Sequence, residues 1–417
     1  MVIRHMRTIV LATLALLLLA GCSPALQTQV QRLVPRRTVA SASVAPASPD
    51  NRLLVQGVDG NLYLASPDGT ERFALTQDAS PSRLYTQPTW SPDGMLVAFS
   101  RITNKGSALV TSRFDGSNRS EVAVPFAPFY INWSPTGDKL AYLSNWQVVD
   151  EPSIALRLVD LSAQKNEART LAAGQPFYFS WAPDGEQLIT HIGNERVEIQ
   201  QTSGKSNSLA FATGSFPAPQ WTDDGNQLLY ATAGDDGQAL VVSELDGTQR
   251  AEITNYDGRI TFLQNTSNSR VAYVLTDADR QASTYGPLLV TDLPSMRTRE
   301  LAEGPVVAFF WSPDGEKLAY LTFEAMRGRI GMRWNVWDGE ERTPYALFFP
   351  TQTFFQNYLP FFDQYAQSHN LWAPDSQSFV FAGTLPGAER GVWVQPVDEG
   401  SKPVYAGPGV FASWSPQ

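Results

Sequence analysis

The residues best suited to chemistry in this chain are two histidines, a recurring set of aspartates and one cysteine. His191 and His369 have no third ligand at a recognisable spacing, so a zinc site is not expected. The aspartates could be imagined as a ring of calcium ligands, but no dense Asp-rich loop is present and each one is needed by its own turn. Phosphate-binding loops and nucleophile motifs are not found. We therefore predict no metal, no cofactor and no enzymatic activity. The aspartates in question are Asp93, Asp184, Asp314 and Asp375.

The cysteine, Cys22, directly follows Leu19-Ala20-Gly21. Arg4 and Arg7 precede an apolar run that has the order of a secretory signal and is short for a membrane span. Leu-Ala-Gly-Cys resembles the bacterial lipobox. That resemblance implies cleavage before Cys22 and a lipid on its thiol, which would anchor the protein to a membrane. An ordinary signal peptide or an uncleaved anchor is the alternative.

Three segments follow from this interpretation. Residues 1–21 are the predicted lipoprotein signal peptide, and residues 22–50 are a flexible tether rich in Ala, Ser, Pro and Val. Residues 51–417 are the predicted single folded domain. The protein would lie outside the cytoplasm, on the outer face of the cytoplasmic membrane or, in a diderm organism, at the outer membrane. A formal net charge of −10 argues against nucleic-acid binding.

The aspartates belong to a repeated motif, which is clearest at Trp311-Ser312-Pro313-Asp314-Gly315. Pro presets a turn, Asp can accept hydrogen bonds from turn amides, and Gly accepts a positive φ, so the chain must reverse at each copy. We interpret each tryptophan as an apolar wedge between neighbouring repeats. A degenerate copy runs from Gln264 to Asn268. The copies that keep the tryptophan begin at Trp90, Trp133, Trp181, Trp221, Trp311, Trp372 and Trp414.

A spacing of roughly 40 to 50 residues with about four strands per repeat is typical of a propeller blade. An apolar content of 43% suits a folded β-protein. Residues 52–76 predict three strands of a blade that lacks its innermost strand, and residues 410–416 predict that strand. We therefore predict an all-β, eight-bladed propeller of four-stranded blades, closed by the N- and C-terminal strands in one blade. Seven blades is the alternative, if the degenerate copy is not a full blade.

The motif, followed by Lys or Gln, Leu, Ala and an aromatic residue, resembles the repeats of TolB-type propellers. It is also similar to the propeller domain of prolyl oligopeptidase-like peptidases. The resemblance covers residues 52–417 and implies a propeller. We find no counterpart of the α/β domain that precedes the TolB propeller, or of a hydrolase domain. Tol-Pal partnership and peptidase activity are therefore not implied.

One candidate binding region is an insertion at about residues 348–369, which lengthens the seventh repeat. If its aromatic side chains are exposed, they would form a surface for a partner or ligand. If it folds back as a short helix into the channel mouth or over the seventh blade, it is core. Both interpretations remain open. The aromatic residues are Phe354, Phe355, Tyr358, Phe361, Phe362 and Tyr365.

A second candidate is a set of small polar residues that directly precede motif tryptophans. Innermost strands line the axial channel of a propeller, so these residues would form a polar funnel; ordinary hydrogen bonding between blades is the alternative. They are Thr89, Asn132, Ser180, Gln220 and Ser413.

These features together favour a lipid-anchored extracytoplasmic binding or scaffold module of the bacterial envelope, with a protein or small-ligand partner. The alternatives are a propeller enzyme of lyase or cyclase type with its site in the channel, and a sensor domain for a partner.

Overall fold

The computed structural model describes residues 44–417, except for 149–150, 164–166, 194–195, 210–216, 235–236, 266, 268, 277–284 and 327. Cys22, the predicted signal peptide and the tether as far as residue 43 lie outside the described residues. Within the described residues, no helix is long and apolar enough to cross a membrane.

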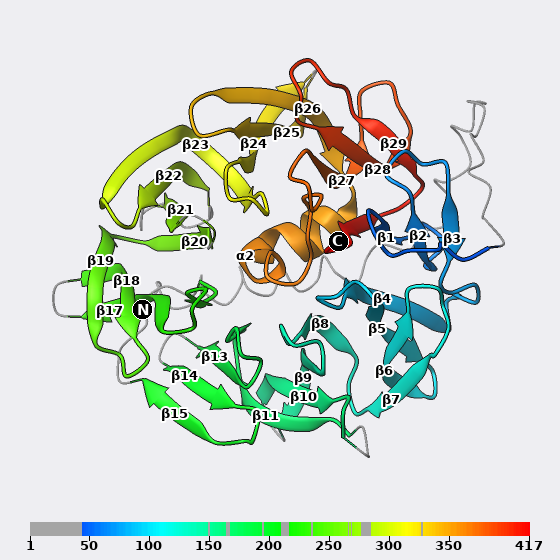
Figure 1. Cartoon of the computed structure of the whole chain (residues 1–417), viewed down its shortest axis with the longest axis horizontal. Helices are drawn as coiled ribbons and strands as arrows, with labels where there is room; N and C mark the ends of the chain where they lie inside the picture. Colours follow the sequence, from blue (N-terminus) through cyan, green and yellow to red (C-terminus); the bar gives the residue numbers. More distant parts are fainter. Residues whose placement is uncertain are drawn as a thin grey trace, which may run out of the picture. The chain divides into compact units, whose positions relative to one another are not determined.

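The strands of the unit formed by residues 39–417 are arranged as blades around a central axis (Figure 1). In the described part of the chain they form five four-stranded antiparallel sheets and one ten-stranded sheet. The protein is therefore an all-β propeller. Four of the smaller sheets follow one another along the chain. The first two are β4 (Arg83–Trp90), β5 (Leu96–Thr103), β6 (Gly106–Arg113) and β7 (Ser120–Val124), and then β8 (Pro128–Trp133), β9 (Lys139–Val148), β10 (Glu151–Asp160) and β11 (Arg169–Gly174). The next two are β12 (Phe177–Trp181), β13 (Gln187–Ile192), β14 (Arg196–Gln201) and β15 (Ser206–Leu209), and then β16 (Gln220–Trp221), β17 (Gln227–Gly234), β18 (Gly237–Glu244) and β19 (Gln249–Tyr256).

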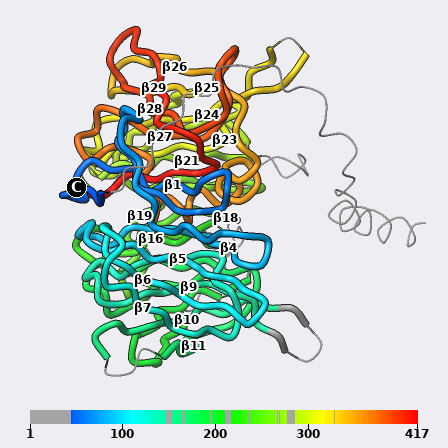
Figure 2. Tube along the Cα trace, turned by 90° about the vertical axis from the view of Figure 1, so that its right-hand side faces the viewer, coloured from blue at the N-terminus to red at the C-terminus, as the bar shows by residue number. Residues whose placement is uncertain are grey.

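The fifth four-stranded sheet joins the two ends of the described chain. Its strands are β3 (Arg72–Ala74), β2 (Leu62–Ala65), β1 (Leu53–Gln56) and β30 (Phe411–Trp414). Leu53 pairs with Trp414 and Gln56 with Phe411, and the Trp414 indole N–H donates to Asn51 Oδ1 at 3.0 Å. Figure 2 shows β1 beside the C-terminal strand. The predicted pairing of strands from the two chain ends is confirmed.

The ten-stranded sheet is continuous because two of its strands extend from one repeat into the next. The first part of β23 pairs with β22, and its last part pairs with β24. In the same way β26 pairs first with β25 and then, at Phe349 and Pro350, with β27. The strands are β20 (Arg259–Asn265), β21 (Arg270–Thr276), β22 (Gly286–Asp292), β23 (Arg297–Trp311), β24 (Leu318–Met326), β25 (Arg329–Trp337), β26 (Arg342–Pro350), β27 (Ser378–Thr384), β28 (Arg390–Pro396) and β29 (Val404–Gly407).

The motif turn is held by side chains that bond to its own backbone. Ser312 Oγ donates to Asp314 and accepts the Lys317 N–H at 2.9 Å, while Asp314 Oδ1 accepts the Glu316 N–H at 3.0 Å. Gly315 has φ +73°, which a residue with a side chain resists. The chain reversal therefore requires Ser, Asp and Gly at these positions. The polar side-chain groups of Ser and Asp are already used in hydrogen bonds within the turn.

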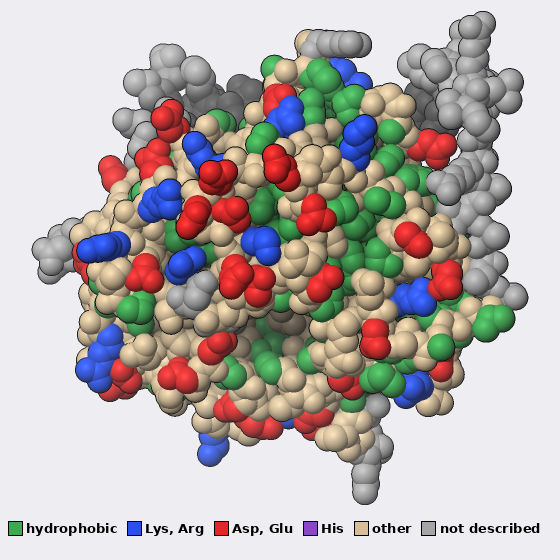
Figure 3. All heavy atoms as spheres, turned by 45° about the horizontal axis from the view of Figure 1, so that its top comes forward, with side chains coloured by type: hydrophobic (Ala, Val, Ile, Leu, Met, Phe, Trp, Pro, Cys, Tyr) green, Lys and Arg blue, Asp and Glu red, His purple; other side chains and the backbone are tan. Residues whose placement is uncertain are grey.

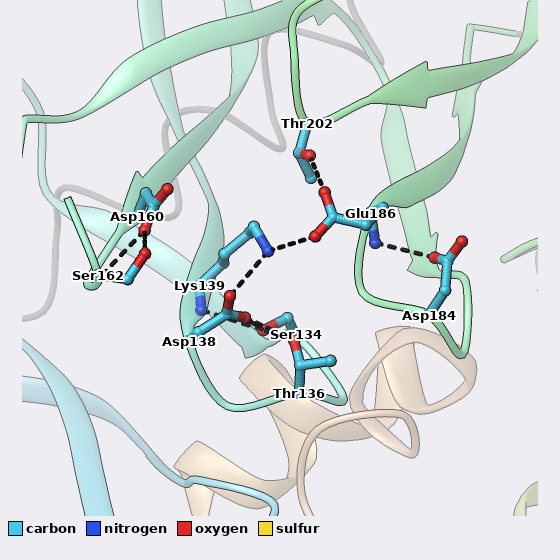
Figure 4. Close-up of polar contacts among 9 residues, drawn as sticks. All are labelled: Ser134, Thr136, Asp138, Lys139, Asp160, Ser162, Asp184, Glu186 and Thr202. Atoms are coloured by element: carbon cyan, nitrogen blue, oxygen red, sulfur yellow. Dashed lines mark hydrogen bonds and ion pairs between the residues drawn. The ribbon is translucent and has the colours of Figure 1, made fainter.

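The copy at Trp133 shows how a changed motif keeps the same network (Figure 4). Thr136 stands where most other copies have Asp, and Asp138 supplies the carboxylate that Ser134 Oγ reaches at 3.1 Å. Lys139 Nζ then lies 2.9 Å from Asp138 and 2.8 Å from Glu186 in the next sheet. This ion pair links two neighbouring blades.

The tryptophans lie between consecutive repeats. The indole N–H groups of Trp181 and Trp221 donate to the backbone carbonyls of Asn132 and Ser180, the residues just before the preceding motif copy. Trp311 and Trp372 bond to the preceding innermost strand in the same way. Each of these indoles is therefore fixed across a blade boundary.

Candidate functional site: the axial funnel

A cavity of about 740 Å³ opens on the face where the motif turns lie. We call this cavity the funnel. Figure 3 views the face obliquely and shows it hollowed. Its walls include the first residue of every motif copy, so each repeat contributes to one shared site. These residues are Trp90, Trp133, Trp181, Trp221, Gln264, Trp311, Trp372 and Trp414.

The insertion closes the inner end of the funnel. It forms a π-helical turn η2 (Phe354–Tyr358), a 3₁₀ turn η3 (Leu359–Phe361) and the short helix α2 (Phe362–Tyr365), which lies near the centre of the ring in Figure 1. Residues 366–371 then line the funnel.

Most of the aromatic side chains of the insertion are buried. Phe354, Tyr358, Phe362 and Tyr365 belong to the core, so they cannot form an exposed binding surface. Phe355 and Phe361 remain 41% and 46% exposed. The interpretation of the insertion as core therefore describes four of its six aromatic residues, and the exposed-surface interpretation is wrong for those four.

Hydrogen bonds tie the insertion to innermost strands of different sheets. The Gln364 carboxamide donates to the Phe179 carbonyl at 2.7 Å and accepts the Phe179 N–H at 2.9 Å, as a neighbouring strand would. Tyr130 Oη donates to the Gln364 carbonyl at 2.9 Å, and Thr89 Oγ1 donates to the Ser368 carbonyl at 2.9 Å. Strands β4, β8 and β12 therefore all hold the insertion in place.

Burial shifts the pKa values of three ionisable groups toward their neutral forms. Burial raises the pKa of Asp363 to about 6, against the hydrogen bond that its Oδ2 accepts from the Ala218 N–H at 2.9 Å. Burial lowers the pKa of His369 to about 3 and that of His191 to about 4. Within the described residues, no group of three His, Cys, Asp or Glu side chains could hold a metal ion.

The polar residues predicted to form a funnel divide into two groups. Asn132, Ser180 and Gln220 line it. Thr89 and Ser413 are buried and lie outside the lining. Gln220 also serves the alternative role, because its Nε2 donates to the Phe262 carbonyl at 3.0 Å in the neighbouring sheet.

Several further lining residues were missed from the sequence, among them Gln264 and Asn370. Gln264 stands where every other copy has a tryptophan, and its Oε1 is buried with no hydrogen-bond partner among the described residues. The sequence signal that could have identified Gln264 as a lining residue is the replacement of the motif tryptophan by a glutamine.

Comparison with known proteins agrees with this architecture. No protein-family model matches the chain. A stretch of 73 residues, 17% of this chain and 17% of the relative, is 36% identical to the Tol-Pal system protein TolB of Hahella chejuensis. The crystal structure of TolB from Acinetobacter baumannii is 16% identical with a TM-score of 0.39, and the similarity covers 71% of this chain and 62% of that one. A eukaryotic initiation factor is 14% identical with a TM-score of 0.52, over 88% of this chain and 99% of that one.

The arrangement of its sheets thus makes the molecule a β-propeller. The predicted resemblance to TolB-type repeats is confirmed, and it is partial: the matched segment is a small share of the curated relative. At these identities, the likeness to solved structures concerns the fold alone.

Proposed function

We propose that this protein is a binding module of the bacterial cell envelope that captures its ligand in the funnel. One observation carries the proposal: the funnel is a cavity of about 740 Å³ that opens on the motif face and ends at the insertion. A preformed concave site within about 300–1,000 Å³ is the usual form of a ligand pocket. Its lining consists mainly of amides, hydroxyls and apolar groups rather than a paired acid and base, which favours binding over lyase or cyclase chemistry.

The proposed location outside the cytoplasm is supported by two features. The sequence around Cys22 resembles a lipobox, and the similar curated protein is named as part of the Tol-Pal system. A lipid on Cys22 would hold the propeller at a membrane, on the tether of residues 22–50.

An eight-bladed ring is also part of the proposal. The eight motif positions, from Trp90 to Trp414, all line one cavity. The ten-stranded sheet counts as three blades, because β23 and β26 each end one repeat and begin the next.

Photo-crosslinking in intact cells tests the site. A p-benzoylphenylalanine in place of Ser267, which is exposed and lines the funnel, should form a covalent adduct. The same group in place of Ile330, which is 73% exposed near the start of β25 and outside the lining, is the matched control. Adducts from position 330 and none from position 267 would contradict the proposal. The anchor is tested separately: Cys22→Ser should move the protein from the membrane fraction to the soluble fraction.

A further inference from the structure

The funnel is nearly uncharged, although the protein is acidic. The chain has 41 acidic and 31 basic residues, yet among the described residues that line the funnel Asp223 is the one carboxylate, and no Lys or Arg is present. His369, at the inner end, is kept neutral by burial. A charged ligand would lose its hydration on entering the funnel, and the lining has little opposite charge to compensate for that loss. The lining therefore favours an uncharged ligand.

Several polar groups in the lining are already occupied. The Asn265 carboxamide donates to the Gly315 carbonyl at 2.6 Å and accepts the Ser267 N–H at 3.0 Å. The Gln220 carboxamide bonds to the Phe262 carbonyl and to the Gln264 N–H. These groups hold neighbouring blades together and are not available to a ligand.

Among the described residues, the lining amide and hydroxyl side chains of Asn132, Ser180, Gln264 and Asn370 have no hydrogen-bond partner on another residue, and neither do the indole N–H groups of Trp90 and Trp133. The four amide and hydroxyl side chains come from β8, β12, β20 and the insertion, so they surround the cavity rather than cluster on one wall. Three of them carry a carboxamide, which both donates and accepts. A buried acceptor without a partner, such as Gln264 Oε1, costs free energy that a ligand hydroxyl or N–H can recover.

Gln264 also changes the shape of the site. A carboxamide is smaller than an indole, so the degenerate copy is the one sector of the ring where the motif position offers a hydrogen-bonding group instead of a tryptophan. The degenerate copy is thus the sector best suited to recognise a ligand.

From this arrangement we propose that the funnel binds a short uncharged saccharide, recognised through hydrogen bonds from Gln264, Asn132, Ser180 and Asn370. This inference rests on the proposed function. Sugar hydroxyls donate and accept at once, which suits unoccupied carboxamides placed around a cavity. A protein partner would instead be held by accessible aromatic anchors and charge pairs. The funnel offers little of either, because charge is nearly absent and every motif tryptophan except the partly buried Trp311 is buried.

Isothermal titration calorimetry on the full purified chain in detergent tests the proposal. The probes are maltotetraose and chitotetraose as neutral saccharides, tetragalacturonate as an acidic one, and an uncharged Gly-Ser octapeptide. We expect saturable binding of at least one neutral saccharide, at least tenfold tighter than that of tetragalacturonate or of the peptide. Gln264→Leu and Asn132→Ala should each weaken it about fivefold to tenfold. Gln352→Ala, at an exposed position outside the lining, is the control and should leave affinity unchanged.

Urea unfolding of each variant separates lost binding from lost folding. Tighter binding of tetragalacturonate or of the peptide, no neutral binding, or neutral binding that Gln264→Leu leaves intact would overturn the saccharide proposal. If crosslinks from position 267 persist in cells in any of these cases, the funnel is still the binding site and only the ligand class is wrong. If the crosslinks from position 267 are also absent, both the saccharide proposal and the proposed function are wrong.

Discussion

The insertion and the funnel lie on the same axis of the propeller, but they use their side chains in different ways. The insertion places aromatic groups such as Tyr358 inside the core and uses its polar groups to bond to innermost strands. The funnel leaves Gln264 and Asn132 unoccupied beside a cavity. A high aromatic content therefore marks the structural region here, and unoccupied hydrogen-bonding groups mark the candidate site.

This difference predicts two kinds of variant. Changes in the insertion should alter stability, because its groups are in use in the folded state. Changes in the funnel should alter binding with little effect on stability.

The largest effect is expected from Tyr358→Ala. The Tyr358 ring lies 5.4 Å from Phe354, 5.0 Å from Tyr365 and 5.1 Å from Phe411, measured between ring centroids. Truncation of a fully buried aromatic side chain should lower the free energy of unfolding by about 3–5 kcal/mol. Urea denaturation followed by tryptophan fluorescence measures the change.

Phe361→Ala is the matched control for that variant, because Phe361 is in the same insertion and 46% exposed. A surface truncation should change the free energy of unfolding by less than about 1 kcal/mol. Equal losses in the two variants would mean that the insertion is not divided into a buried and an exposed side.

The next effect is expected from Gln364→Leu. Leucine has a similar volume but would leave the Phe179 N–H and C=O groups without the partners that Gln364 supplies at 2.9 and 2.7 Å. Two buried unpaired backbone groups should cost roughly 2–4 kcal/mol of stability. Hydrogen exchange at the Phe179 amide should accelerate. Gln356→Leu, at an exposed position of the insertion, should show neither effect.

The contacts of Gln364 also show why the position of the insertion could not be predicted from sequence. The Gln364–Phe179 bonds join residues 185 positions apart, and the Tyr365 Oη bond to Gln87 joins residues 278 apart. Nothing in the local sequence specifies such partners. The motif turns could be predicted, because Ser312, Asp314 and Lys317 bond to one another within five residues.

A pH-dependent effect is expected at Asp363. Its pKa is about 6 in the folded protein and close to 3.8 when unfolded, so folding is most favoured below about pH 4 and this contribution is lost as pH rises through 6. Tyr178 and Tyr130, which interact electrostatically with Asp363, stay protonated because burial raises their pKa. Asp363→Asn can still accept the Ala218 N–H. It should therefore raise stability at pH 8 by about 2–3 kcal/mol relative to the wild type.

The measurement is the difference in the free energy of unfolding between Asp363→Asn and the wild type from pH 4 to pH 8. His191 and His369 titrate in both proteins, and their contribution cancels in that difference. A difference that does not change between pH 4 and 7 would show that the carboxyl is not buried as described.

The candidate site could be predicted in part. The regular spacing of the motif tryptophans predicts that Asn132, Ser180 and Gln220 lie on innermost strands, and all three line the funnel. Whether a lining group is free depends on its neighbours in the next blade, as the bond between Gln220 and the Phe262 carbonyl shows. The sequence alone could not separate Gln220, which is occupied, from Asn132, which is not.

The smallest effect on stability is expected from Gln264→Leu, which also tests the comparison most directly. Leucine removes a buried acceptor that has no partner among the described residues, and the Gln264 backbone N–H keeps its 2.7 Å bond to Gln220. The free energy of unfolding should therefore change by less than about 1 kcal/mol, since no satisfied hydrogen bond of the side chain is lost. Gln264→Trp should likewise fold, because it restores the residue found in the other copies, while filling this sector of the funnel. If either variant unfolds the protein as Tyr358→Ala does, the funnel wall is structural in the same sense as the insertion, and the division between the two regions does not hold.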